Sequence, residues 1–173
     1  MKAVVVFTGK DLNIMRTEGG SGYWHARTDR LNDAEYLIAV RNRRETWAVK
    51  DLEHGTAFLI AKITGCFKNP DYDDRNVITF DEYAVIHSPD AWKMLTGGQR
   101  YPVAYLNAQE AFLRIGVTPE QLNGRNSILH PHRFLMQWFL VWLKRKQKNS
   151  PLTRQLKEPK RILATQQELI AQP

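Results

Sequence analysis

Apolar runs and alternating runs fill the first two thirds of the chain and predict β-strands. Three aliphatic runs are typical of buried strands, at residues 3–7, 35–40 and 56–64. Residues 77–86 alternate apolar and polar positions, so that strand should have one exposed face. Residues 103–106 predict a further short strand, and Gly65 marks a turn or bulge. Loop chemistry separates these runs at residues 17–22, 68–76 and 87–101.

After residue 106 the spacing of apolar residues changes from that of strands to that of helices. Apolar residues recur with i, i+3, i+4 spacing between Asn107, a possible N-cap, and Gly116, a stop signal. Thr118 and Pro119 form a second start signal. The longest predicted helix spans residues 130–148 and gathers four large apolar side chains on one face: Leu135, Trp138, Phe139 and Trp142.

The order of elements, strands first and helices afterwards, predicts an α+β fold. We expect a mostly antiparallel or mixed, curved sheet, because no long helix separates the strands as a parallel βαβ fold would require. Residues 1–125 should form this domain, and residues 126–173 a basic helical C-terminal extension.

The net positive charge of the chain lies entirely in the extension. Residues 1–125 carry 16 Lys and Arg against 16 Asp and Glu, whereas residues 126–173 carry nine against two. Such asymmetry favours contact with a polyanion, although a basic run can also simply solvate a helix end. The candidates for phosphate contact are Lys144, Arg145, Lys146 and Lys148.

Most catalytic signatures are absent from the sequence. There is no Gly-x-Ser-x-Gly elbow and no Walker loop, and Cys66 stands alone. His130 and His132 lack further ligands in a metal-binding spacing, and the acidic residues 71–74 lie in a predicted solvated loop. We therefore expect no metal and no cofactor, and a binding module rather than an enzyme. A nuclease or a base-modifying enzyme remains the alternative.

No segment of the sequence predicts a membrane span. The longest nearly apolar run, residues 134–143, is too short for a bilayer core of about 30 Å. The first residues lack the full apolar region and cleavage site of a secretory signal. We expect a soluble, cytoplasmic protein without a membrane partner.

Aromatic residues alternate with arginines in the predicted loops and at strand ends. They include Tyr23, Trp24, Trp47 and Trp92, with Arg41, Arg44 and Arg100 nearby in the sequence. A nucleic-acid base stacks on an aromatic face, Arg or Asn reads its edge, and basic groups hold phosphate. The same aromatic residues could equally close a small core.

Several segments together resemble the EVE-like branch of the PUA-like superfamily. They are HGTAFLIAKITG at 54–65, FDEYAVI at 80–86 and RYPVAYLNAQEAFLRIGVTPEQL at 100–122, with a weaker match in EYLIAVRN at 35–42. The resemblance implies a small, strongly bent mixed β-barrel with short flanking helices. It also implies binding of RNA or DNA, with a modified or flipped base in an aromatic pocket. Carried onto this chain, it names Trp24, Trp47 and Trp92, beside Tyr23, as the pocket, and Arg41 and Asn42 as edge readers.

The leading prediction is a non-catalytic module that binds RNA or DNA. The barrel would hold one base and the basic tail would contact phosphates. A protein-interaction module stays open as well, because the apolar run at 134–143 could join two copies of the chain in a homodimer.

Overall fold

The computed structural model describes residues 1–69, 72–122 and 124–125. In chain order the elements are β1 (Lys2–Thr8), α1 (Leu12–Thr17), β2 (Ser21–Trp24), α2 (Thr28–Asn32), β3 (Tyr36–Arg41), β4 (Ala57–Asn69), β5 (Tyr72–Ser88), α3 (Ala91–Thr96), β6 (Val103–Asn107), α4 (Ala108–Ile115), the 3-10 turn η1 (Pro119–Gln121) and β7 (Gly124–Arg125). The predicted basic helix and its phosphate-contacting residues lie outside the described residues, as does the proposed dimer face.

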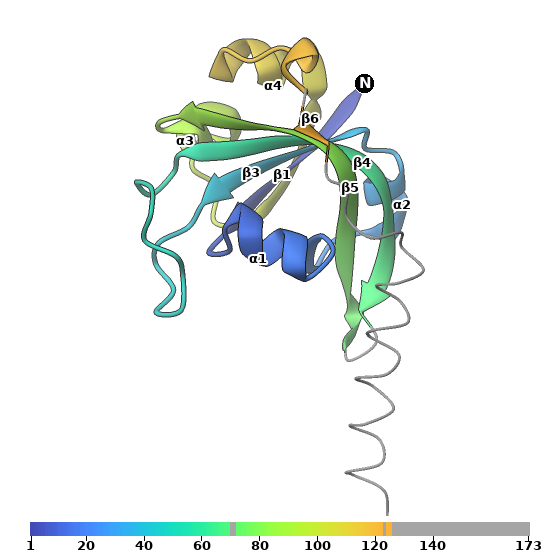
Figure 1. Cartoon of the computed structure of the whole chain (residues 1–173). Helices are drawn as coiled ribbons and strands as arrows, with labels where there is room; N and C mark the ends of the chain where they lie inside the picture. Colours follow the sequence, from blue (N-terminus) through green and yellow to red (C-terminus); the bar gives the residue numbers. More distant parts are fainter. Residues whose placement is uncertain (70–71, 123, 126–173) are drawn as a thin grey trace, which may run out of the picture. The chain divides into compact units, whose positions relative to one another are not determined.

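The strands form one mixed sheet with the order β2-β5-β4-β3-β1-β6, and β7 pairs with β5. β1 and β3 are parallel, while the other neighbours along this path are antiparallel. The sheet curls into a half-barrel, with β4 and β5 bending furthest (Figure 1). The predicted mixed, curved sheet with short helices is therefore confirmed.

Irregular pairing between the two long strands explains the curl. The register of β4 against β5 shifts at four places. Two of these shifts flank Ile63, and one of the two lies between Ile63 and Gly65. Each bulge bends its strand and increases the local right-handed twist. The predicted irregularity at Gly65 is thus confirmed.

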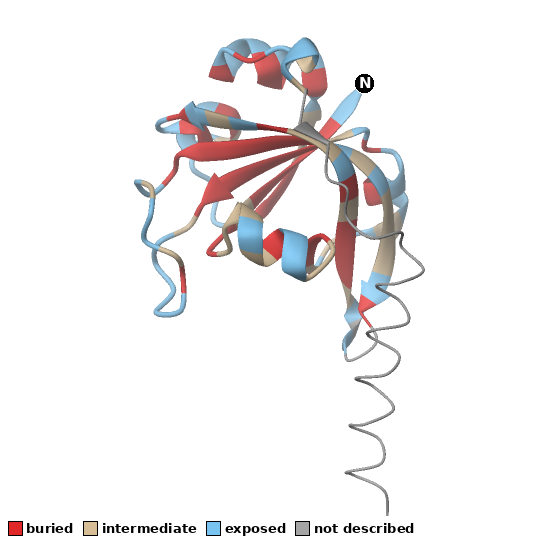
Figure 2. Ribbon diagram, viewed as in Figure 1, coloured by how far each residue is buried: buried red, intermediate tan, exposed pale blue. Residues whose placement is uncertain are grey.

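Both faces of the sheet are buried at its centre, because the middle positions of the central strands are apolar on both faces. Successive side chains of a strand point to opposite faces. Val4 and Val6 belong to a core that also contains Met15 of α1 and Leu31 of α2. Ala3 and Val5 belong to a second core, which α3 and α4 cover. Figure 2 shows the resulting buried centre of the sheet and the exposed outer turns.

The N-caps of two helices follow from single polar side chains. The Asp11 carboxylate accepts a hydrogen bond from the Ile14 N–H at 2.7 Å, and Asn107 caps α4 by accepting from the Glu110 N–H at 3.2 Å. The cap at Asn107 was predicted from the sequence and is confirmed, as is the end of the helix at Gly116, whose φ is 68°.

Three segments differ from the sequence prediction. Residues 87–101, expected to be loop, contain α3, and residues 68–76 are mostly the paired tip of the β4–β5 hairpin. The segment between β1 and β3 carries α1, β2 and α2, which together make the crossover that a parallel pair needs. Short polar helices such as LNIMRT give a weak periodic signal, so packing decides their form.

No helix within the described residues is long and apolar enough to cross a membrane.

Candidate functional site

One open pocket collects two of the predicted site residues, Asn42 and Trp92. Its volume is about 550 Å³. We call it the Trp92 pocket, and it is lined by Phe7, Asn42, Arg44, Glu45, His54, Trp92, Lys93, Gly97, Gly98, Gln99, Arg100 and Pro102. These residues come from the end of β1, the loop after β3, α3 and the loop before β6. Segments far apart in the sequence thus meet at one place.

An aromatic wall closes one side of the Trp92 pocket. The rings of Phe7 and Trp92 stack in parallel, with centroids 4.4 Å apart and an interplanar angle of 7°. His54 meets Phe7 edge-on at 4.9 Å. Because Trp92 is 6% exposed and one of its faces is covered by Phe7, it forms a fixed wall and not a free stacking platform.

The indole N–H of Trp92 also fixes the loop before β6. It donates to the Gln99 carbonyl oxygen at 3.2 Å. The side-chain amide of Gln99 in turn donates to the carbonyl oxygens of Tyr101 and Val103, each at 3.0 Å. The loop that carries Arg100 is therefore held by side chains as well as by its backbone.

Cations outnumber acids in the Trp92 pocket. Arg44, Lys93 and Arg100 are exposed, and within the described part of the chain none of them forms an ion pair. Glu45 is the single acid in the lining. Three cations on separate segments around one hollow suit an anionic ligand such as phosphate.

His54 presents a neutral ring to the pocket. Partial burial lowers the pKa of His54 below its ordinary value of 6.5, and the charges of Arg44 and Arg43 lower that pKa further. The Nδ1 atom accepts a hydrogen bond from the Arg43 N–H at 3.2 Å. In a neutral ring the proton then sits on Nε2, so His54 can donate one hydrogen bond to a ligand.

Asn42 lies at the start of the same loop. Its N–H donates to the Thr8 carbonyl at 2.7 Å, which continues the β1–β3 pairing. Its side-chain oxygen accepts from the Arg44 N–H at 3.0 Å. The side chain of Asn42 thereby shapes the turn that presents Arg44, and the side-chain NH2 group remains as a donor.

Arg41, predicted to read a base edge, lies in the interior with an exposed fraction of 0%. Its guanidinium approaches Asp51 twice, with Nε to Oδ1 at 2.9 Å and Nη2 to Oδ2 at 3.0 Å. Nη1 donates to the Lys10 carbonyl at 2.6 Å, and the group lies 4.4 Å over the Phe58 ring. Arg41 therefore ties the 42–56 loop to the segment after β1.

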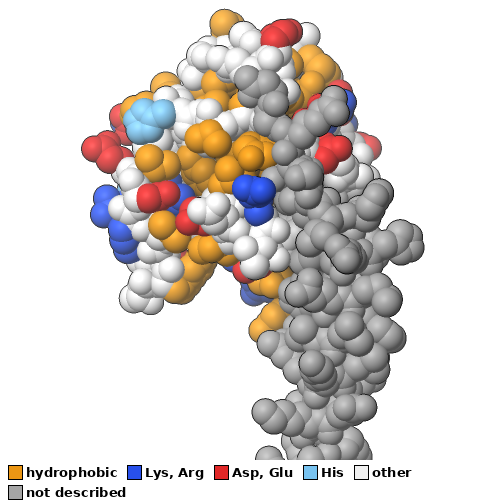
Figure 3. Space-filling view, in the orientation of Figure 1, with side chains coloured by type: hydrophobic (Ala, Val, Ile, Leu, Met, Phe, Trp, Pro, Cys, Tyr) orange, Lys and Arg blue, Asp and Glu red, His pale blue; other side chains and the backbone are white. Residues whose placement is uncertain are grey.

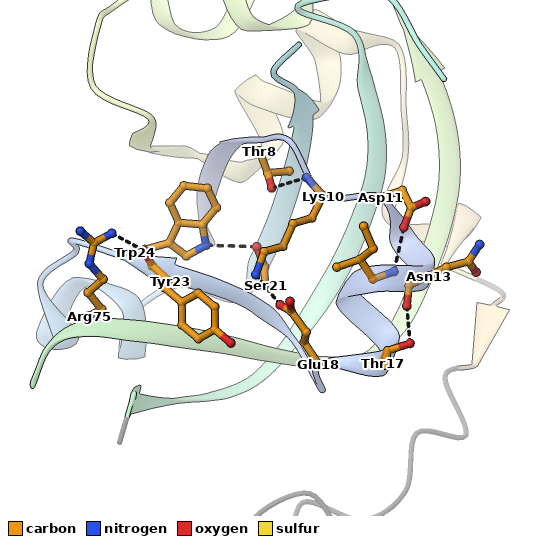
Figure 4. Close-up of polar contacts among 11 residues, drawn as sticks. Thr8, Lys10, Asp11, Asn13, Thr17, Glu18, Ser21, Tyr23, Trp24 and Arg75 are labelled. Atoms are coloured by element: carbon orange, nitrogen blue, oxygen red, sulfur yellow. Dashed lines mark hydrogen bonds and ion pairs between the residues drawn. The ribbon is translucent and has the colours of Figure 1, made fainter. Parts of the chain in front are cut away.

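Tyr23 and Trp24 lie elsewhere, on β2 (Figure 4). Trp24 is buried, and its indole N–H donates to the Ser21 hydroxyl at 3.1 Å. The Lys10 ammonium lies 4.3 Å over the Tyr23 ring and pairs with Glu18. None of these side chains lines the Trp92 pocket.

Trp47 occupies a fourth place, in the 42–56 loop. It is 61% exposed and packs on Gly9, where an added Cβ would come within 2.8 Å of the indole ring. The six predicted base-contacting residues thus divide among four positions, and the structure brings only Asn42 and Trp92 into the Trp92 pocket.

Figure 3 shows one face of the molecule, with hydrophobic side chains gathered at its centre and charged side chains of both signs around them. The described residues contain no group of three or more His, Cys, Asp or Glu side chains placed to hold a metal ion. Cys66 is half-buried, and burial raises the pKa of its thiol.

No family model, curated protein or solved structure matches this chain. The Trp92 pocket is therefore interpreted from its own geometry and charge. Several of its residues gave little sequence signal: Phe7 belongs to a buried strand, and His54 begins the HGTAFLIAKITG segment without being singled out as a binding residue. Arg44 and Arg100 lie in predicted polar segments near tryptophans, and this proximity was the sequence feature that indicated a binding role for them.

Proposed function

We propose that this chain is a non-catalytic nucleic-acid binding protein that receives one nucleotide of a single strand in the Trp92 pocket. The observation that carries the proposal is the meeting of three exposed cations, an aromatic wall and a side-chain amide around one hollow of about 550 Å³. Phosphate groups need the cations, while a base needs an apolar wall and a few polar groups along its edge.

The residues divide naturally between the two parts of a nucleotide. Arg44, Lys93 and Arg100 hold phosphate, because they are exposed and come from three directions. The amide of Asn42 and the Nε2–H of His54 face the base edge. The Phe7–Trp92 pair forms the wall against which the base packs.

Arg41 acts in this proposal as a positioning residue. Its contacts to Asp51 and to the Lys10 carbonyl fix the loop that carries Asn42 and Arg44. The sequence resemblance named Arg41 as an edge reader and not as a positioning residue, but it also implies binding of a base, and we propose that the half-barrel is of the PUA-like, EVE-like type. The resemblance then favours a modified or flipped base as the ligand, with Lys144, Arg145, Lys146 and Lys148 adding phosphate contacts.

Fluorescence anisotropy tests the proposal with labelled single-stranded and duplex RNA and DNA, at about 50 and about 200 mM salt. The decisive variant is Arg100→Glu. Its control is Arg16→Glu on α1, which makes the same charge change at an exposed site outside the Trp92 pocket. Both variants change the net charge equally, so a difference between their affinities for nucleic acid shows direct contact at Arg100.

We expect Arg100→Glu to weaken single-strand binding on the order of tenfold relative to Arg16→Glu, since one charged hydrogen bond contributes about 1.5–3 kcal/mol. Wild-type affinity should fall steeply between the two salt concentrations. Equal affinities of the two variants would show that nucleic acid does not enter the Trp92 pocket. Absence of binding to all four nucleic acids at low salt would reject the proposed function.

A further inference from the structure

The half-barrel leaves an open seam. β2 and β6 stand at the two ends of the strand order, and no described strand joins them. A cavity of about 750 Å³ lies along this opening. One wall is β6 from Val103 to Leu106, and the other is the segment from His25 to Arg30 that follows β2. We call this cavity the seam groove.

The wall opposite β6 is firmly tied to β5. The Asn76 amide donates to the Ala26 carbonyl at 2.7 Å, and the Arg75 guanidinium donates to the Tyr23 carbonyl at 3.3 Å. His25 lies 3.1 Å from Asp74 through Nδ1 and Oδ2. These bonds come from β5, so the groove is built by tertiary contacts and not by a loose loop.

The seam groove and the Trp92 pocket are neighbours. Gly97 and Gln99 line both cavities, so the loop before β6 forms the ridge between them. The two residues that follow on this loop divide between the cavities: Arg100 lines the Trp92 pocket and Tyr101 lines the seam groove. A chain that occupies one cavity can therefore continue into the other over the Gly97–Gln99 ridge.

The lining of the seam groove is basic. It contains Arg27, Arg30 and Arg114 together with His25, against the single acid Asp74. Arg27 pairs with Asp29, and Arg114 pairs with Glu110. Arg30 forms no ion pair within the described residues and lies 5.5 Å over the Tyr105 ring.

An exposed aromatic side chain completes the groove. Tyr101 is 68% exposed, the highest value among the aromatic side chains of the described residues. An exposed ring beside cations offers a stacking surface for a base, with the phosphates held alongside. Within the described residues no aromatic ring stacks on Tyr101, whereas Phe7 covers one face of Trp92.

We infer that the seam groove is a second nucleic-acid site, which takes the nucleotides next to the one in the Trp92 pocket. In it a base stacks on Tyr101 and Arg30 holds a backbone phosphate. This inference rests on the proposed function. The free edge of β6 could also receive a peptide strand, but the cationic lining and the shared ridge favour a polyanion that is continuous with the first site.

The test compares a labelled mononucleotide, which can fill only one site, with a labelled single-stranded dodecamer of the same base, on the full chain. The variants are Tyr101→Ala and Arg30→Ala. Tyr72→Ala is the control, because Tyr72 is also exposed, at 56%, and lines neither cavity. Thermal unfolding of each variant shows whether the fold is intact.

We expect Tyr101→Ala to weaken dodecamer binding on the order of 5- to 100-fold, the range of one lost base stack, and to leave mononucleotide binding in the Trp92 pocket unchanged. Arg30→Ala should lower the slope of log affinity against log salt by about 0.7 for the dodecamer. Tyr72→Ala should match the wild type with both ligands.

Three results would overturn the inference. Equal binding of the mononucleotide and the dodecamer, with no effect of Tyr101→Ala, would reject the second site and leave the proposed function standing. An equal loss for the mononucleotide and the dodecamer would place Tyr101 in the first site. If neither ligand binds, the proposed function fails together with the second site. An acidic extended peptide that binds the same groove would then identify β6 as a peptide edge.

Discussion

In the ion pair between Arg41 and Asp51, loss of Asp51 should destabilise the fold more than loss of Arg41. The Asp51→Asn variant tests this difference. The Arg41 side chain is 0% exposed, whereas that of Asp51 is 44% exposed. Removal of the Asp51 carboxylate leaves the Arg41 guanidinium unpaired in the interior, whereas removal of the guanidinium leaves a carboxylate that water can reach. A fully buried pair that loses one partner costs about 3–5 kcal/mol.

The exposure of Asp51 reduces this figure. The Asn side chain keeps one acceptor, and the Arg41 bond to the Lys10 carbonyl remains. We therefore expect Asp51→Asn to lower the free energy of unfolding by about 2–3 kcal/mol. Arg41→Met should cost less, about 1–2 kcal/mol, because Met can keep much of the packing on Phe58.

Urea unfolding followed by tryptophan fluorescence measures both changes. With a slope of about 2 kcal/mol/M, Asp51→Asn should lower the midpoint by about 1–1.5 M. The control is Asp29→Asn, which breaks an Arg–Asp pair that is exposed on both sides and should leave the midpoint unchanged. If Asp51→Asn behaves like Asp29→Asn, or costs less than Arg41→Met, the assigned role of Arg41 is refuted.

The remaining predictions concern one helix cap, one titration and one ring. Asn107→Ala should destabilise the domain by about 1 kcal/mol in the same urea assay, because it removes the N-cap of α4; an unchanged midpoint would contradict this. The pKa of His54 is lowered by burial and by nearby arginines, so stability should fall as pH decreases below about 6.5, where the unfolded chain takes up the proton more readily. Bound phosphate should raise the pKa of His54 again, and an NMR titration that shows the same value with and without oligonucleotide would count against phosphate in the pocket. Trp92→Phe keeps a ring against the wall but loses the N–H donated to Gln99, so oligonucleotide affinity should fall more than stability does; equal affinity would show that the bond does not position the loop.

Much of the sheet could be predicted from the sequence because its strands carry a strong local signal. The aliphatic runs at β1, β3 and β4 and the alternation in β5 follow directly from burial on two faces or on one. The cap at Asn107 and the stop at Gly116 are local as well, since each depends on one side chain or one φ angle.

The short helices could not be predicted in the same way. α1, α2 and α3 each span six residues or fewer, too short for a periodic pattern, and form where tertiary packing covers Met15, Leu31 and Trp92. The parallel pairing of β1 and β3 depends on this crossover.

The candidate site was only partly visible in the sequence, because tryptophan does not indicate on its own whether it packs or binds. Trp24 and Trp92 are both buried, yet one supports β2 and the other lines a pocket. Arginine is equally ambiguous: Arg41 is structural, whereas Arg44, three positions later, faces the pocket. Only the folded arrangement separates these roles.

The central claim is that nucleic acid contacts the Trp92 pocket, and NMR chemical-shift mapping of the ¹⁵N-labelled full chain tests it most directly. A single-stranded oligonucleotide should shift the amide signals of Asn42, Lys93, Gly97 and Gly98, which surround the pocket. Shifts confined to β2 and the Lys10 segment, or no shifts at all, would contradict the account.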